Sequence, residues 1–343
     1  MKRFTYSVLL ICFISAIVVG CKKLGGPALP ADRLKAILLG KDTVTLYAGE
    51  KNNVPVTLTP SSYSLDSILW ESLDTSVLSI SKAGQIFAKK PGATIVSISN
   101  IAKTISVNCK VIVKDSLWAD LIAYYPFNNN RLDSSGNKNH VVEHKDVIST
   151  VNRFGKPNTA YAFNGTSSYM AVADKPALRL NNTDFTINMW VNLDEYIYAS
   201  GSALLSKNSG PFQKGWNSSI IGYESVNGVP GNPFYNVSGG EDPFGFGNKI
   251  ITTGAWHMLT ITYAVKAAKI SFYIDGVFDR TVSNIPSPNG LVSARLHIGD
   301  NSLNDIPTNG SPPYYLKGKL DEIRIYKRAL KQAEITRLLN LDI

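Results

Sequence analysis

Short runs of alternating apolar and polar residues fill most of this chain and limit it to folds that are built from β-strands. In FTINMWVNL, every second residue from Phe185 to Val191 is apolar. Because successive side chains of a strand point to opposite faces, such a run turns one face to a core. Only RALKQAEITRLL (328–339) has helical spacing, with leucines and an isoleucine that would pack on the rim of a sandwich. The pattern predicts an all-β chain with a short C-terminal helix.

Two β regions follow each other along the chain. Residues 36–114 hold seven short runs with turn signals between them, and this number and spacing predict a small β-sandwich. Trp70 is the large aromatic residue that would fill the space between its two sheets. Residues 117–343 have a normal length for one larger two-sheet sandwich.

Two dipeptides in the second region predict tight turns. Asp275 and Gly276 separate two alternating runs and predict a two-residue hairpin, because a type I′ turn needs two positive φ angles. Asn164 and Gly165 give a second signal of the same kind.

Residues 1–21 predict a lipoprotein signal peptide. A basic start precedes an apolar stretch from Tyr6 to Val19, which is shorter than the roughly 20 apolar residues of a permanent membrane helix. The sequence VVGC then resembles the bacterial lipobox, which implies that Cys21 is lipidated and becomes the N-terminus. We therefore expect a cell-envelope protein that is anchored to a membrane through lipid.

A Gly- and Pro-rich stretch, residues 22–35, predicts a tether behind Cys21. The outer membrane is the expected location, because the chain resembles lipoproteins of Gram-negative bacteria. Some of these carry an acidic surface-export signal directly after the cysteine, whereas this chain has Lys22 and Lys23 there. The sequence leaves open whether the protein faces the periplasm or the cell surface.

The net charge of +9 does not predict nucleic-acid binding. Residues 1–35 carry +5, residues 36–114 carry +3 and residues 115–343 carry +1, so the excess lies near the expected anchor, where anionic lipid attracts it. Cys12 leaves with the signal peptide and Cys21 takes the lipid. The remaining Cys109, in ISVNCKVIV, is predicted to be a small buried residue on a strand.

The motifs of residues 36–114 resemble the bacterial Ig-like domains of group 2. They are GE after a strand, Trp70 in LWESLD, SVLSI, GQI and PGATI, and they cover nearly the whole region. The resemblance implies a spacer or adhesion module.

The second region resembles the LamG-like, concanavalin A-like lectin/glucanase family. Its motifs follow in order as IAYYPFNNNRLDSSGNKNH, RFGKPNTAYAFNGTSSYMAV, DFTINMWVNL, WHMLTITY, ISFYIDGVFDR and LKGKLDEIRIYKRALKQAEI. The resemblance implies a two-sheet jelly roll, often with structural calcium. Such domains occur in extracellular binding modules and are appended to glycan-active enzymes.

The stretch LDSSGNKNH (132–140) is a candidate calcium loop. Calcium takes six to eight oxygens from carboxylates, amides and backbone carbonyls, and Asp133, Asn137 and Asn139 could supply several. In the family, the Asp of this loop and the Asp of the final strand, here Asp321 in GKLDEIRIY, resemble a calcium pair. The alternative is an Asx-rich turn whose side chains satisfy its own backbone.

The carboxylates do not predict catalysis. Jelly-roll glucanases place two carboxylates on one strand face, as in Glu-x-Asp-x-x-Glu, and the chain contains no such triplet. Asp321 and Glu322 are adjacent, which predicts that they point to opposite faces of a strand. We therefore expect that the protein is not an enzyme.

Aromatic residues in loops rich in Gly, Asn and Pro predict a ligand site, because ring faces stack on sugars while amides bind hydroxyls. They are Trp216, Tyr223, Phe234, Tyr235, Phe244 and Phe246 in residues 215–248, with Tyr314 and Tyr315 in NGSPPYYLKG. The alternative is that several of these rings anchor long loops to the core.

The sequence thus predicts a lipid-anchored envelope protein in which an Ig-like spacer holds out a jelly roll. That jelly roll would bind carbohydrate or a cell-surface protein without catalysis. The alternatives are a structural surface or adhesion protein without a glycan site, and a glycan-active enzyme of an unrecognised type.

Overall fold

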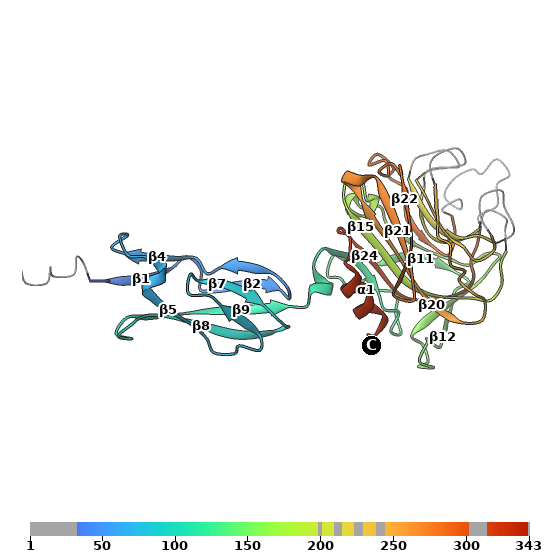
Figure 1. Cartoon of the computed structure of the whole chain (residues 1–343). Helices are drawn as coiled ribbons and strands as arrows, with labels where there is room; N and C mark the ends of the chain where they lie inside the picture. The colour runs from blue at the N-terminus through green and yellow to red at the C-terminus, as the bar shows by residue number, and fades with distance from the viewer. Residues whose placement is uncertain are drawn as a thin grey trace, which may run out of the picture. The chain divides into compact units, whose positions relative to one another are not determined.

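The computed structural model describes residues 33–197, 201–208, 215–222, 229–237, 244–301 and 314–341. The predicted signal peptide, Cys21 and most of the tether therefore lie outside the described residues. The chain divides into two compact units (Figure 1). The first extends to Ile112, except that segments 46–50 and 88–92 group with the second unit, which continues from Val113.

The first unit is a small β structure. It has a four-stranded sheet of order β2-β9-β8-β5, a three-stranded sheet of order β3-β7-β6, and a separate pair of β1 and β4. Its strands are β1 (Ala36–Leu39), β2 (Thr43–Tyr47), β3 (Lys51–Asn53), β4 (Val56–Thr59), β5 (Ile68–Ser72), β6 (Leu78–Ile80), β7 (Gln85–Ala88), β8 (Gly92–Asn100) and β9 (Ser106–Lys114). Cys109 is fully buried on β9, which confirms its predicted place on a strand.

The second unit consists of two large antiparallel sheets. An eight-stranded sheet has the order β12-β13-β24-β15-β20-β21-β22, with β10 also paired to β24, and a seven-stranded sheet has the order β11-β14-β23-β16-β17-β18-β19. This arrangement and the C-terminal helix confirm the predicted fold class of a mostly β chain with a jelly-roll domain.

The first strands of this unit are β10 (Leu121–Tyr125), β11 (Val141–Lys145), β12 (Ile148–Thr150), β13 (Ala160–Asn164), β14 (Tyr169–Val172), β15 (Phe185–Leu193), β16 (Ser202–Lys207) and β17 (Trp216–Ile220). The others are β18 (Pro233–Asn236), β19 (Phe244–Phe246), β20 (Trp256–Ala264), β21 (Lys269–Ile274), β22 (Val277–Ser283), β23 (Leu296–Ile298) and β24 (Lys317–Tyr326). The helical segments of the described chain are η1 (Leu65–Ser67), η2 (Ser116–Trp118), η3 (Pro176–Arg179), η4 (Val265–Ala267) and α1 (Gln332–Leu339).

One apolar core lies between the inner faces of the two large sheets, and strand alternation produces it. In β15, the predicted apolar positions from Phe185 to Val191 all belong to this core. The remaining residues of β15 are buried as well, because further elements cover the outer face of the eight-stranded sheet.

One of the two predicted hairpins forms. Asp275 and Gly276 connect β21 to β22 with φ angles of 52° and 75°, as a type I′ turn requires. The second prediction was wrong, because β13 and β14, which flank Asn164 and Gly165, belong to different sheets. The Asn164 side chain instead accepts hydrogen bonds from the backbone of the residues that follow it.

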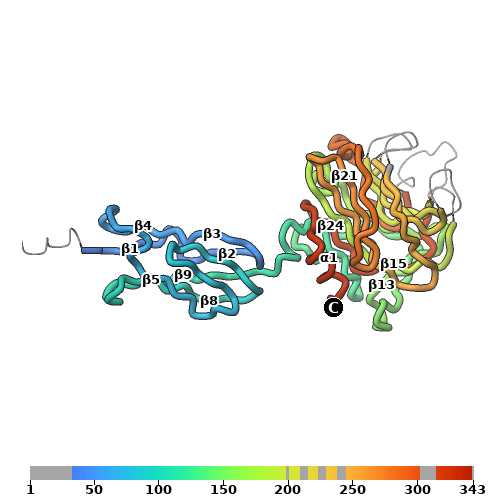
Figure 2. The backbone as a smooth tube through the Cα atoms, viewed as in Figure 1, coloured from blue at the N-terminus to red at the C-terminus, as the bar shows by residue number. Residues whose placement is uncertain are grey.

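Helix α1 covers part of the outer face of the eight-stranded sheet (Figure 2). The helix begins where the Glu334 carboxylate accepts a hydrogen bond from the backbone of Lys331. Ile335 and Leu338 are buried on its inner side. They pack in one apolar cluster with Tyr124, Trp190, Met258 and Tyr326 of the sheet. In the described part of the chain, no helix is both long and apolar enough to cross a membrane.

A buried ion pair fastens β16 to the loop after β14. The Lys207 ammonium is 1% exposed, lies 2.5 Å from Asp174 Oδ1 and donates to the carbonyl of Ala294. Burial raises the pKa of the Asp174 carboxyl, but hydrogen bonds from Arg179 and Lys207 outweigh it and lower that pKa. Burial lowers the pKa of Lys207, against the opposing hydrogen bond and charge of Asp174, so the carboxylate is what favours the charged ammonium inside the fold.

Replacing Asp174 should destabilise the protein, because Lys207 would keep a buried charge without its carboxylate. We expect Asp174→Ala to lower the free energy of unfolding by about 3–5 kcal/mol in urea titrations. Asp194→Ala, which breaks the exposed pair of Asp194 with Lys319, is the matched control and should cost at most about 1 kcal/mol. Equal losses in the two variants would contradict this account.

Candidate functional site

The outer face of the seven-stranded sheet gathers polar and aromatic side chains. On β17, Trp216 and Ile220 belong to the core, so Asn217 and Ser219 point to the outer side. The pairing register continues this outer face across β18 and β19, where Ser219 lies opposite Phe234 and Asn217 opposite Asn236.

Phe234 and Phe246 form an aromatic pair on this face. They are partners across β18 and β19, with ring centroids 5.0 Å apart, and both are half-buried. Gly245 lies between the two phenylalanines of β19 and faces inward, where a Cβ would come within 2.9 Å of Ile270 on the opposite sheet. The glycine thus lets β19 approach the core while Phe246 turns outward.

The two rings and their polar neighbours form one uncharged surface, which we name the Phe234–Phe246 platform. It consists of the half-buried Asn217, Phe234, Asn236 and Phe246 and of Ser219, which is 1% exposed. The Ser219 hydroxyl donates to Asn217 Oδ1 at 2.8 Å. Such a surface offers ring faces for apolar contact, and amide groups that donate and accept hydrogen bonds.

Two of the predicted ligand residues lie in the core instead. Trp216 and Tyr235 are fully buried, the first donating from its indole N–H to the carbonyl of Leu178 at 3.0 Å. Tyr235 packs near Phe185 with ring centroids 5.8 Å apart. These positions leave no ring face for a ligand, because the inward side of each strand is filled by the core.

The other predicted aromatic residues have mixed outcomes. Tyr223 and the side chain of Phe244 lie outside the described residues. Tyr315 is 8% exposed and packs in a cluster with Tyr169 and Ala171, while Tyr314 is half-buried with φ +52°. The structure therefore brings together Phe234 and Phe246 and separates them from the tyrosine pair, which anchors its own segment.

Sequence reasoning missed a polar cluster toward the other edge of the same sheet. The Tyr169 hydroxyl donates to Glu143, which also pairs with Arg295 at 2.6 Å. The ring of Tyr169 stacks on His297, whose Nδ1 lies 2.6 Å from Asp300 Oδ1. The bond to Glu143 raises the pKa of Tyr169 to about 12. Alternation in RLHIG was the available signal, since Leu296 and Ile298 face the core and His297 does not.

The predicted calcium residues do not share one site. In loop 132–140, Asp133 Oδ1 accepts from the backbone N–H groups of Tyr124 and Ser135, and Oδ2 accepts from the Ser135 hydroxyl and the Asn139 N–H. Asn137 and Asn139 point their amide N–H groups at the backbone of β10. This donor set does not fit a calcium shell, because the oxygens of Asp133 already accept four hydrogen bonds.

Asp321 belongs to a different cluster on the outer face of the eight-stranded sheet. It is 1% exposed, and its Oδ2 lies 3.5 Å from Arg153 Nη1. The Arg153 guanidinium lies over the rings of Trp190 and Phe154 and donates to the carbonyl of Leu341. Within the described residues, no hydrogen bond or ion pair joins Asp321 to loop 132–140, so Arg153 is the cation that it meets.

The prediction that Asp321 and Glu322 point to opposite faces was wrong. A register shift and a φ of 53° at Glu322 mark a β-bulge in β24. Glu322 binds the Tyr124 hydroxyl and the Arg324 guanidinium on the same outer face. Both acids are therefore held by buried arginines. No group of three or more His, Cys, Asp or Glu side chains suited to a metal occurs in the described ranges.

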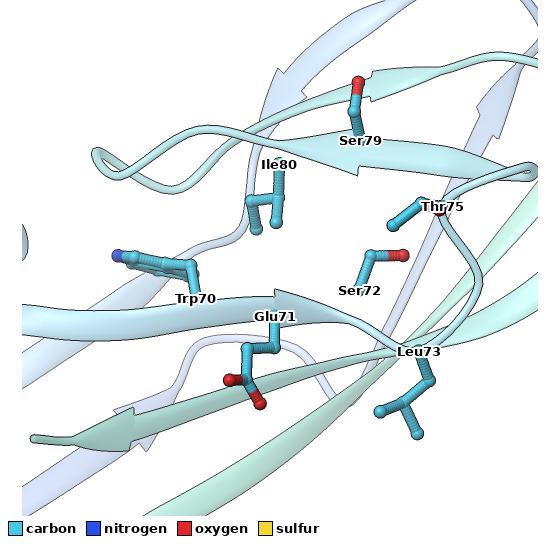
Figure 3. A pocket seen from close by; sticks show the side chains of 7 residues that line it. All are labelled: Trp70, Glu71, Ser72, Leu73, Thr75, Ser79 and Ile80. Atoms are coloured by element: carbon cyan, nitrogen blue, oxygen red, sulfur yellow. The ribbon is translucent and has the colours of Figure 1, made fainter.

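The first unit has a shallow hollow between the edge strands β5 and β6 (Figure 3). Trp70, Ser72 and Ile80 point into it, whereas Glu71 and Leu73 point to the other side of β5. Trp70 fits there because Gly84 has no Cβ, which would come within 2.6 Å of the indole. The hollow brings no set of reactive or metal-binding groups together.

The two large sheets of the second unit define a jelly-roll-like β-sandwich. The sequence model of the Concanavalin A-like lectin/glucanases superfamily matches residues 164–336, just over half of the chain. The chain belongs to this superfamily. No curated protein sequence matches it significantly.

Solved structures share the fold at low identity. The binding domain of Paraclostridial Mosquitocidal Protein 1 is 18% identical with a TM-score of 0.51, covering 66% of this chain and 53% of that one. The second structure is domain 4 of AbnA, a GH43 extracellular arabinanase from Geobacillus stearothermophilus, in complex with arabinotriose. It is 23% identical with a TM-score of 0.47, and the match covers 65% of this chain and 99% of that domain. The chain thus spans about half of the toxin binding domain, and the similarity to that domain shows the fold alone.

The pH dependence of stability should reveal the buried state of Asp321. The pKa of Asp321 is raised from 3.8 to about 8. Burial is the largest cause and the negative charge of Glu322 is the next, whereas the positive charge of Arg153 acts in the opposite direction. Because its pKa is higher in the folded state, protonated Asp321 favours folding. This contribution to stability is complete below the unfolded-state pKa of 3.8 and is lost as the pH rises toward 8. We expect the melting temperature of Asp321→Asn, relative to the native protein, to rise between pH 4 and pH 9. A constant difference across this range would show that Asp321 is ionised throughout.

Proposed function

We propose that this chain is a lipid-anchored envelope protein whose second domain binds carbohydrate or a cell-surface protein without catalysis. The Phe234–Phe246 platform carries this proposal. Its two rings are 5.0 Å apart beside Asn217 and Asn236, on the outer face of the seven-stranded sheet. The uncharged, amide-bearing surface favours a neutral sugar over an anionic one, since no residue of the platform would pair with a carboxylate or sulfate.

The superfamily includes lectins and glucanases, so binding has to be weighed against catalysis. Hydrolysis of a glycosidic bond needs two carboxyl groups on either side of the scissile bond. Near this outer face, Glu143 is bound to Arg295 and Tyr169, and Asp300 to His297. Asp321 and Glu322 are buried on the other sheet. These arrangements support a binding role, as in the toxin domain of the same fold, which is named a binding domain.

The proposals for a lipid anchor and a spacer rest on the sequence. We propose that Cys21 carries lipid, that residues 22–35 form the tether, and that the first unit is an Ig-like spacer that holds the binding domain away from the membrane. The outer membrane is the proposed location, on either of its faces.

The platform is tested by glycan-array screening followed by calorimetry on residues 22–343, which lack Cys21. We expect Phe234→Ala and Phe246→Ala each to weaken binding of the selected ligand at least about tenfold, because each removes a stacking face. Phe278→Ala is the matched control, since Phe278 is 50% exposed and pairs with Tyr273 on the opposite sheet. Equal effects of all three variants, or no ligand at all, would count against the platform.

The anchor is tested by fractionating cells that express the full-length chain. We expect the native protein to remain with the membrane and to incorporate labelled fatty acid, because buried acyl methylenes contribute about 0.8 kcal/mol each. Cys21→Ser should lose the label and the membrane association, while Cys109→Ser, at the buried cysteine, should keep both. Fatty acid that persists in Cys21→Ser would refute the assignment.

A further inference from the structure

Among the described strands, β10 pairs with β24, and loop 132–140 lies along its other edge. The Tyr124 N–H donates to Asp133, and the Tyr124 carbonyl accepts from Ser134 N–H at 2.8 Å. The carbonyl of Ile122 accepts from the amide groups of Asn137 and Asn139. An unpaired strand edge leaves such groups exposed for non-native pairing. The loop therefore replaces a neighbouring strand with hydrogen bonds from its side chains and from one backbone N–H.

A lysine ammonium already lies at the backbone carbonyls of this loop. Lys175 Nζ is 3.2 Å from the carbonyl oxygens of both Asn137 and Lys138. Lys175 precedes η3 and accepts a hydrogen bond from Leu178 N–H, and Leu178 is fully buried in the core. Backbone carbonyls are ligands that hard cations prefer. Here the fold directs a cationic side chain of its own to them.

We infer that loop 132–140 is a metal-independent clamp on β10, in which the Lys175 ammonium, and not a metal ion, binds the backbone carbonyls of Asn137 and Lys138. Three observations support this inference. The Asp133 oxygens are filled by four internal donors, the loop carbonyls receive Lys175, and Asp321 is bound to Arg153 elsewhere. Asn139 Oδ1 is a buried loop acceptor without a partner, and one acceptor is far fewer than a calcium ion requires.

The inference is independent of the proposed ligand and is tested by thermal melts in EDTA and in millimolar calcium. The native protein should melt at the same temperature in both. Lys175→Met and Asp133→Asn should each melt several degrees lower than the native protein, equally with and without calcium. The matched controls are Lys145→Met, at an exposed lysine of β11, and Asp146→Asn, at a carboxylate that accepts from Ser167. Neither should change the melting temperature by as much.

Hydrogen exchange at the Tyr124 amide gives a second readout that does not depend on calcium. We expect at least about tenfold faster exchange of this amide in Asp133→Asn, because the charged carboxylate that accepts the Tyr124 N–H hydrogen bond is replaced by a weaker neutral acceptor. No such change is expected in Asp146→Asn. A calcium-dependent rise in the native melting temperature that Asp133→Asn abolishes would overturn the inference. Unchanged stability of Lys175→Met would overturn it as well.

Discussion

The packing of two sheets across one apolar core is the constraint on which the rest of this structure depends. Side chains along a strand alternate between two faces, so each residue that the core takes sends its neighbours outward. Tyr235 lies in the core between Phe234 and Asn236, and the inward Gly245 sets the direction of Phe246. A shift of one residue in register would bury the platform and expose the core, so the site is fixed as firmly as the fold.

The two outer faces of the second unit differ in what covers them. Helix α1 and the segments around it cover part of the eight-stranded sheet, where an apolar cluster with Trp190, Met258 and Tyr326 forms. The buried charges of Asp321, Glu322 and Arg324 lie on the same outer face. The seven-stranded sheet instead carries amides, hydroxyls and aromatic rings on its outer side. A partner that needs both stacking and hydrogen bonds finds these groups on the seven-stranded sheet.

Buried charges in this domain fasten its segments. Arg324 binds Glu322 and lies 4.1 Å over the ring of Tyr124, Arg153 holds the carbonyl of Leu341 near the C-terminal end, and Lys207 ties β16 to Asp174. Removing such charges from water is costly, and only several hydrogen bonds at each charge offset the cost. This explains why acids that could suggest catalysis in the final strand have a structural role.

The sequence by itself determined the all-β class, the Asp275–Gly276 hairpin, the buried Cys109 and the C-terminal helix, because alternation and turn chemistry act over a few neighbouring residues. It also identified Phe234 and Phe246 as aromatic residues of one loop-rich segment. Only the tertiary structure decided that Trp216 and Tyr235 face the core, since periodicity does not show which side of a strand meets the opposite sheet. It likewise placed Asp133 among N–H donors of β10 and of its own loop, and Asp321 beside Arg153, because the contact between Arg153 and Asp321 joins distant parts of the chain.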